Sequence, residues 1–258
     1  MIRRQLITAL IVVVIMTVGL GLVYPLVVTG IAQVAFNGKA NNSLIKVNGK
    51  AVGSSLLGQS FTDKNGNPIP KYFQSRPSAA GTGYDASSSS ASNLGPSNPN
   101  LIGNIPGVAI STKTNPFATP SDPYCVPVQA TDKAGNDITD KAGNPVYEKN
   151  NDGTYVCDPN TVPERVLAYR QLNGLGPNVK VPVDAVTASG SGLDPDISIA
   201  NADLQAPTVA RARHLPLATV TGLIAADTTG RSLGVLGDPG VNVLTLNLAL
   251  DATGTHGA

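Results

Sequence analysis

Two groups of residues contain the side chains that nucleophilic catalysis requires. Ser43 and Lys46 match the Ser-x-x-Lys spacing of acyl-serine enzymes, but the companion Ser-Asp-Asn and Lys-Thr-Gly motifs are missing from the sequence. Ser191, Asp194 and His214 are the residue types of a catalytic triad, yet Ser-Gly-Ser-Gly around Ser191 is not the Gly-x-Ser-x-Gly nucleophile elbow. We interpret this stretch as a Gly/Ser turn, and the sequence predicts no catalytic residue.

A short pattern with oxygen-bearing side chains occurs three times. Residues 62–68, 131–136 and 139–145 each contain Asp-Lys-x-Gly-Asn. Asp and Asn side chains are calcium ligands, but the closing acidic ligand of a calcium loop is missing at the right spacing. The pattern instead suits a tight turn with a positive φ at the Gly. We predict that the last two copies form hairpin tips, and the sequence predicts no metal site.

The two cysteines, Cys125 and Cys157, allow three kinds of chemistry. In an oxidising compartment a disulfide is the default, and in a reducing compartment two free thiols are the alternative. A shared metal ion would need further ligands, but neither His214 nor His256 lies at ligand spacing from either cysteine. We therefore expect a Cys125–Cys157 disulfide if this part of the chain lies outside the cytoplasm.

The composition limits the range of functions. The 258 residues include 18 Lys and Arg against 17 Asp and Glu, so no basic surface field is expected and no nucleic-acid partner is predicted. The chain lacks Gly-x4-Gly-Lys-Ser/Thr and a strand-linked Gly-x-Gly-x-x-Gly, which excludes the usual nucleotide-binding loops. The 27 Gly and 20 Pro residues indicate a loop-rich domain with a modest core.

The longest apolar run, residues 6–28, organises the rest of the chain. No Lys, Arg, Asp or Glu occurs over residues 5–38, and about 20 apolar residues suffice for a helix to cross a bilayer. Arg3 and Arg4 precede the run, and the next basic residue is Lys39, which predicts a cytoplasmic N-terminus. A cleaved signal peptide is the alternative, but its apolar region is usually only about 7–15 residues long.

The predicted organisation is α+β, with one transmembrane helix in the cell membrane and one domain outside it. Residues 1–36 form the cytoplasmic N-terminus and the helix, and residues 37–258 form an extracytoplasmic mixed α/β domain. Within that domain we predict a core over residues 37–101 and 161–258 and a hairpin-rich insert over residues 102–160.

Small residues in the membrane helix could admit a neighbouring helix. Thr17, Gly19 and Gly21 would allow close approach, and we predict them as contacts with partner helices. Tyr24 suits the outer membrane interface, and Pro25 is tolerable near a helix end; both are included in the predicted contact surface. A plain anchor that faces only lipid is the alternative.

Local signals predict the elements of the external domain. Asn48-Gly49 indicates a hairpin turn, while Thr161 and either Asp196 or Ser198 can cap helices. Clean alternation of Leu with other residues near the C-terminus indicates a strand with one buried face. We expect helices over residues 161–172, 196–214 (interrupted or bent at Pro207) and 216–230, and strands over residues 44–47, 50–52, 181–187 and 241–250.

Five sequence blocks occur in an order that resembles one known family. They begin with Gly-Leu-Val-Tyr-Pro-Leu-Val-Val-Thr in the membrane helix and include Ser-Asn-Leu-Gly-Pro-Ser-Asn-Pro in the external domain. The blocks cover residues 21–33, 53–61 with 72–79, 92–99, 181–195 and 241–251. They resemble the C subunit of the Kdp-type potassium-transporting ATPase.

Two departures from that family pattern stand out. Residues 102–160, with both cysteines, are not part of the usual pattern and look like an added lobe. Where the family usually has Gln-x-Pro-Arg-Val-Ala-x-Ala-Arg, this chain has Thr208 in place of the first Arg.

The resemblance implies a non-catalytic subunit of a complex that hydrolyses ATP to import potassium. Its partners would be a potassium-channel-like subunit and a P-type ATPase subunit. ATP and potassium would be ligands of the complex, and no cofactor is expected on this chain itself. The resemblance also implies a catalytic chaperone that raises the ATP affinity of the pump, with Gln205 in contact with the nucleotide.

The charge asymmetry disagrees with that last implication. It places Gln205 outside the membrane, whereas ATP is in the cytoplasm. We therefore favour a structural role, in which the helix packs on the ion-conducting subunits and the external domain caps their outer mouth. A hypothesis from another class is a membrane-anchored extracellular binding module without a pump partner, and a surface hydrolase is the third.

Overall fold

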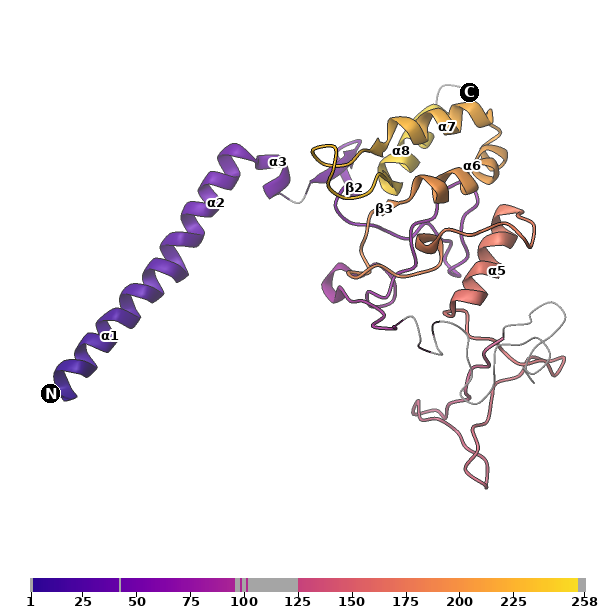
Figure 1. Ribbon diagram of the computed structural model, residues 1–258, viewed down its shortest axis with the longest axis horizontal. Helices are drawn as coiled ribbons and strands as arrows, with labels where there is room; N and C mark the ends of the chain where they lie inside the picture. The colour runs from indigo at the N-terminus through magenta and orange to yellow at the C-terminus, as the bar shows by residue number, and fades with distance from the viewer. Residues whose placement is uncertain (1, 42, 96–97, 99–100, 102–124, 255–258) are drawn as a thin grey trace. The chain divides into compact units, whose positions relative to one another are not determined.

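The computed structural model describes residues 2–41, 43–95, 98, 101 and 125–254. The chain divides into two compact units, Met1–Leu56 and Leu57–Ala258. The first contains a long apolar helix and the second combines helices with a small sheet (Figure 1). The α+β prediction and the single N-terminal apolar helix are confirmed.

The apolar helix of the first unit extends from Ile2 to Ala35 and is long and apolar enough to cross a membrane. It consists of α1 (Ile2–Val18), the π-helical turn η1 (Gly19–Val23) and α2 (Tyr24–Ala35), and none of its side chains is buried. The wider turn precedes Pro25, which has no N–H to donate and whose ring would collide with the carbonyl one turn earlier. The backbone N–H of Tyr24 therefore reaches back to the carbonyl of Gly19.

A short helix and a hairpin complete the first unit. After α3 (Asn37–Ala40), strand β1 (Leu44–Val47) pairs antiparallel with β2 (Lys50–Ser54). Asn48 and Gly49 have φ values of 51° and 78°, the left-handed conformation that a two-residue hairpin turn requires. The predicted hairpin is confirmed.

In the described part of the second unit, four α-helices form most of the structure. Thr161 caps the first, and Ser198 caps the second by accepting a hydrogen bond from the N–H of Asn201. Both caps were predictable because a hydroxyl side chain satisfies a free N–H of the first turn. Pro207 lies inside the second helix, which continues past it. The helices are α5 (Val162–Asn173), α6 (Ile199–Arg213), α7 (Leu217–Ala226) and α8 (Val243–Gly254).

A three-stranded antiparallel sheet lies beside these helices. Its order is β3 (Asp196–Ile197), β5 (Gly240–Asn242) and β4 (Thr228–Thr229), with Ile197 paired to Val241 and Thr228 paired to Val241 from the other side. Strand β5 leads directly into α8. The sheet therefore fixes where α8 begins.

The prediction of a C-terminal strand over residues 241–250 is wrong. Only β5 is extended, and α8 follows from Val243. The fully buried positions are Val243, Leu246, Asn247 and Leu250, whose spacing of three and four residues is that of one helix face. The Leu residues occur at alternate positions, which is also the pattern of a strand. The same segment forms a helix because this conformation packs its apolar face against residues of α6 and α7.

The prediction of a strand over residues 181–187 is also wrong. The segment contains the 3-10 turn η3 (Val183–Ala185), and the Thr187 hydroxyl donates to the carbonyl of Val183 at 2.7 Å. Pro182 cannot donate to a sheet, and Asp184 is held by hydrogen bonds to Ser198. These bonds favour a turn over an extended strand.

The hydrophobic core lies between α6, α7, α8 and the sheet. Phe73 reaches it from an irregular segment and is completely buried. Its partners are Ile197 and Val241 from the sheet and apolar residues of the three helices, which are Ala202, Ala206, Val209, Ala210, Val220, Ile224, Val243, Leu246 and Leu250. A loop residue at the centre of the core means that the irregular segment is part of the folded architecture.

The described part of the predicted insert contains short antiparallel bridges and tight turns; residues 102–124 lie outside the described residues. Gly135 and Gly143 both have a φ of 84°, as the repeat pattern predicted. In the first of these turns the Asp132 carboxylate accepts the N–H groups of Ala134 and Asn136 at 2.8 and 2.9 Å. These bonds lower the pKa of Asp132, led by those from Asn136. The Asp132 carboxylate therefore forms its hydrogen bonds within its own turn.

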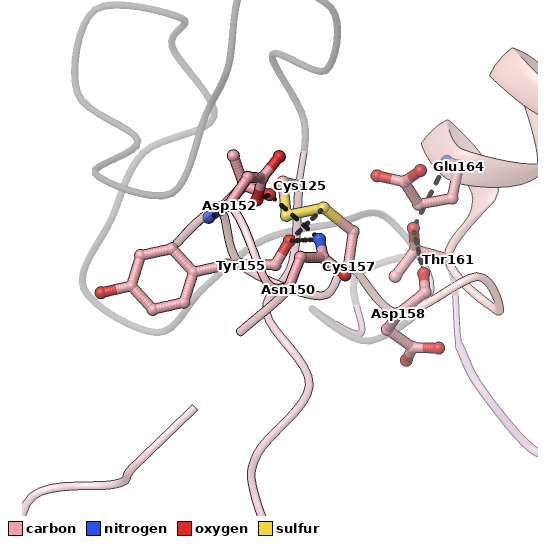
Figure 2. The surroundings of a disulfide bond; sticks show 9 residues. Cys125, Asn150, Asp152, Tyr155, Cys157, Asp158, Thr161 and Glu164 are labelled. Carbon is pink, nitrogen blue, oxygen red and sulfur yellow. Dashed lines mark hydrogen bonds between the residues drawn. A yellow bond between two sulfur atoms is a disulfide. The ribbon is translucent and has the colours of Figure 1, made fainter. Parts of the chain in front are cut away.

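A disulfide joins Cys125 to Cys157 close to the start of α5. Figure 2 shows the sulfur atoms beside Tyr155, and Thr161 capping the helix nearby. The two cysteines enclose residues 126–156, so the covalent bond ties both ends of this stretch together at the point where it joins the helical part of the unit.

Candidate functional site

Two buried amide side chains hold the backbone of Phe73 and Gln74. Asn247 of α8 accepts the N–H of Phe73 at 2.8 Å and donates to its carbonyl at 3.0 Å. Gln205 of α6 accepts the N–H of Gln74 at 2.7 Å and donates to its carbonyl at 3.2 Å. We call Gln205 and Asn247 the amide clamp.

The amide clamp replaces the neighbouring strands that Phe73 and Gln74 lack. Each side chain offers one donor and one acceptor, as a strand edge does. Gln205 is 2% exposed and Asn247 is 1% exposed, so water cannot take over these bonds. A net gain of about 0.5–1.5 kcal/mol per bond is typical, while a buried backbone group left without a partner costs more. The clamp therefore fixes how the core residue Phe73 enters the core.

A polar network lies behind Gln205. Its second N–H donates to Oδ1 of Asn201 at 2.9 Å, and the same oxygen accepts the Tyr169 hydroxyl at 2.8 Å. The Asn201 amide donates to Asp184 at 3.0 Å, and Asp184 also accepts the N–H and hydroxyl of Ser198. Burial, with a smaller effect of the Asp184 charge, raises the pKa of Tyr169. The network links α5, η3 and α6 to the clamped segment.

Arg76 continues this segment and forms an ion pair. Its Nη1 lies 3.0 Å from Oδ2 of Asp194, and its backbone carbonyl accepts the Tyr84 hydroxyl. Burial raises the pKa of Tyr84 to about 12, with a further contribution from the Asp194 charge. The Ser78 hydroxyl donates to the carbonyl of Gly192 at 2.6 Å. These bonds join the segment after Phe73 to the Gly/Ser turn.

An open cleft of about 440 Å³ lies beside the Arg76–Asp194 pair. Asp184, Asp196 and Asp238 also line it, so its charge is mainly negative. Burial raises the pKa of Asp196, a hydrogen bond from Asn242 lowers it, and the Asp194 charge adds to the increase. Within the described ranges, no three His, Cys, Asp or Glu side chains are grouped as metal ligands.

The residues considered for a triad have separate roles. Asp194 pairs with Arg76, and the Ser191 hydroxyl accepts the N–H of Leu193 at 3.1 Å. His214 ends α6 with a left-handed φ of 55°. Ser43, the serine of the Ser-x-x-Lys match, accepts the N–H of Ser55 with its backbone carbonyl.

The residues predicted to contact partner helices lie in the apolar helix. Thr17 is in α1, Gly19 and Gly21 are in η1, and Tyr24 and Pro25 begin α2. Gly19 is partly exposed and the other four are exposed. Their contacts with helices of other subunits stay a prediction.

Three members of the site were not predicted from the sequence. Asn247, Asn201 and Tyr169 are polar residues whose partners are distant in the chain. The one available signal was Asn247, a lone amide in an apolar run, because a buried polar side chain needs a partner. Thr208, which replaces the Arg of the family pattern, is 7% exposed and accepts a hydrogen bond from Arg211 at 3.2 Å.

Comparisons with known proteins agree on one family. A family model described as "KdpC: K+-transporting ATPase, c chain" matches residues 6–137 and 155–252, so the unmatched internal stretch, 138–154, lies within the predicted insert. Each of three relatives is named a potassium-transporting ATPase KdpC subunit. That of Mycobacterium tuberculosis is 41% identical over 249 residues, which cover 96% of this chain and 98% of the relative.

The other two relatives come from different bacteria. The Caulobacter vibrioides protein is 44% identical over 237 residues, 92% of this chain and 87% of the relative. The Acidobacterium capsulatum protein is 42% identical over 244 residues, 95% of this chain and 96% of the relative. The match extends from the apolar helix through the clamped segment to α8, and the chain belongs to the KdpC family.

Proposed function

We propose that this chain is the membrane-anchored, non-catalytic subunit of an ATP-driven potassium uptake complex. Its apolar helix packs against the potassium-channel-like and P-type ATPase subunits. Its folded unit lies outside the membrane, caps the mouth of the potassium pathway and stabilises the assembly. The names of the relatives support the link to potassium transport. The observation that carries the structural role is the buried Gln205 amide, whose oxygen and both N–H groups have partners.

Gln205 is a poor candidate for direct contact with ATP in this arrangement. To reach a nucleotide, its side chain would have to leave Gln74 and Asn201 and become exposed. That movement would remove the partners of the N–H and carbonyl of half-buried Gln74, and a polar group left unpaired in the interior costs about 1–3 kcal/mol. We propose that any effect of Gln205 on the ATP affinity of the pump acts through the fold of this subunit and its assembly.

Two features support an external folded unit. Arg3 and Arg4 precede the apolar helix, and basic residues at one end of a membrane helix favour the cytoplasm for that end. Cys125 and Cys157 form a disulfide, the usual state of paired cysteines in an oxidising compartment. Both features favour the same orientation, although they come from different parts of the chain.

Protease accessibility tests the orientation. We expect that a protease added to spheroplasts removes a C-terminal epitope tag, and that sealed inverted vesicles protect the tag. A thiol reagent added to intact cells should not label Cys125 or Cys157, because both are in the disulfide. The same reagent should label them after a reductant is added. Cleavage only in inverted vesicles would overturn the external placement and would make ATP contact by Gln205 possible again.

Two matched variants distinguish an effect of Gln205 on assembly of the complex from an effect on its affinity for ATP. Gln205→Met keeps the length of the side chain but removes the amide, and Gln171→Met makes the same change at an exposed site. We expect Gln205→Met to reduce recovery of the complex in mild detergent, while complexes that do assemble keep the KM for ATP. A raised KM with normal assembly would contradict the structural role. A wild-type chain that purifies without large membrane partners would favour the binding module.

A further inference from the structure

The loop between β4 and β5 exposes three large apolar side chains at its end. Leu233 is 90% exposed, Val235 is 73% exposed and Leu236 is 58% exposed. We call residues 231–238 the apolar tip. Between Ser232 and Gly237 it contains no side chain that can form a hydrogen bond. Exposed apolar residues that gather in one place mark an interaction site, whereas single ones are ordinary.

The backbone of the apolar tip adds a second observation. Leu233 and Gly234 have positive φ values of 54° and 77°, the pattern of a type I′ turn. The β1–β2 turn uses Asn48 and Gly49 for the same geometry, which is the favoured choice. Leu is unfavourable there because its Cβ crowds the backbone in the left-handed region. A side chain that is both strained and exposed does not stabilise the folded unit, and such local conflicts are typical of functional positions.

Four backbone N–H groups of the apolar tip are bonded within the tip itself. An Arg231–Asp238 ion pair at 2.9 Å closes its base and leaves no net charge there. Groups that enter an apolar medium must have their N–H partners within the segment. Four N–H groups meet this condition: Ser232 to the Leu236 carbonyl (2.9 Å), Leu236 to Ser232 (2.9 Å), Gly234 to Arg231 (3.0 Å) and Val235 to Ser232 (3.2 Å).

We propose that the apolar tip inserts Leu233, Val235 and Leu236 into the interfacial layer of the bilayer that holds the apolar helix. The side chains of residues 233–236 cannot form hydrogen bonds, and the polar side chains of Arg231 and Asp238 are paired with each other, so the end of the tip offers only non-directional contact. Binding to the interfacial layer of a membrane scales with the apolar area that is buried there, which these three side chains supply. The covalent link to a membrane helix keeps the tip at high effective concentration near the surface.

This inference rests on the membrane anchor of the proposed function, but not on the orientation of the folded unit or on its pump partners. The protease experiment tests the orientation alone, because lipid is present on both faces of the membrane. A failure of the predicted orientation would therefore not contradict insertion of the tip, and a failure of insertion would not contradict the orientation.

A single tryptophan can report insertion, because the chain has none. We would place it by Val235→Trp in the full chain, reconstituted in vesicles of phosphatidylcholine and phosphatidylglycerol with and without brominated acyl chains. Val183→Trp is the matched control, since Val183 is also 73% exposed but lies in η3. We expect emission at shorter wavelength and at least threefold stronger quenching by brominated lipid at position 235. Iodide in the water should quench the control more strongly.

A second variant tests whether the apolar side chains cause the insertion. Adding Leu233→Asn to the Val235→Trp chain keeps a residue that accepts the left-handed turn and removes one apolar contact. Quenching by brominated lipid should fall at least twofold, with an unchanged circular dichroism spectrum. Equal quenching at positions 235 and 183 would overturn the proposal. Protection from iodide only in the presence of the other Kdp subunits would show that the tip binds a protein partner and not lipid. Protection only at high protein concentration would show that it binds a second copy of the chain.

Discussion

Two irregular segments of the folded unit satisfy their backbones in opposite ways. The segment around Phe73 and Gln74 depends on the amide clamp, whose members are 174 and 131 residues away along the chain. The apolar tip bonds to itself over a few residues. The first segment is therefore coupled to the whole core, whereas the second is independent of it. Substitutions that affect the first segment should strongly destabilise the protein, whereas substitutions in the apolar tip should change its stability by little.

The largest effect is expected from Asn247→Leu, which keeps the approximate volume but removes the amide. The N–H and carbonyl of Phe73 would then be buried without partners, at a cost of roughly 2–6 kcal/mol for the two groups. Chemical unfolding in detergent, followed by circular dichroism, measures the loss. Asn178→Leu at an exposed site is the control and should change the free energy of unfolding by less than about 0.5 kcal/mol.

Hydrogen exchange makes the same comparison at single amides. The N–H groups of Phe73 and Gln74 should lose protection in Asn247→Leu, while those of Ser232 and Leu236 keep it. Equal loss in both segments would show that the apolar tip is not independent of the clamp.

A smaller loss is expected from Gly192→Ala, beside the clamped segment. A Cβ at this position would lie 2.6 Å from the Ser90 carbonyl oxygen and 2.7 Å from the N of Ala80, and φ is +68°. Overpacking of this kind costs about 1–3 kcal/mol. Gly190→Ala is the control, because a Cβ there meets nothing within 4 Å. Similar melting temperatures for the two variants would contradict the close packing of Gly192.

The parts of the fold that depend on local chemistry were predictable from the sequence. Thr161 and Ser198 begin helices because a hydroxyl caps the first turn, and Asn48-Gly49 turns a hairpin because both residues tolerate positive φ. The apolar helix was predictable from the length of its apolar run and the absence of charged residues. None of these features needs a partner far away in the chain.

The parts that depend on distant partners were not predictable. Asn247 holds Phe73 across 174 residues, a pairing that no local pattern encodes. The α8 segment fitted both a strand and a helix, since Leu244, Leu246, Leu248 and Leu250 alternate while Val243, Leu246 and Leu250 share a helix face. The left-handed Leu233 has no sequence signature, because turn statistics favour Asn or Gly there.

A pH effect is expected at Asp196, in the cleft that also borders the apolar tip at Asp238. Burial raises the pKa of Asp196 above 3.8, against a lowering by the Asn242 amide. Because the folded state then binds the proton more tightly than the unfolded chain, this group makes stability fall as pH rises through the folded pKa. Asp196→Asn should therefore stabilise the protein at pH 7, and the gain should disappear below about pH 4.

Denaturant titrations at pH 7 and pH 3.5 measure this difference. Asp137→Asn makes the same substitution at an exposed carboxylate and is the control. A gain for Asp196→Asn that is equal at both pH values would show that the effect does not come from the buried charge.

The smallest effect on stability is expected from Leu233→Asn, and its sign is opposite to that of the clamp variants. Asn tolerates the left-handed region better than Leu, and the exposed Leu side chain contributes no burial, so stability should rise by up to about 1 kcal/mol. Val235→Asn, at an exposed neighbour without positive φ, should give no gain. A loss of stability in Leu233→Asn would mean that this side chain packs within the folded unit. A gain together with weaker lipid contact would mean that the chain retains Leu233 for the membrane, at the expense of its own turn.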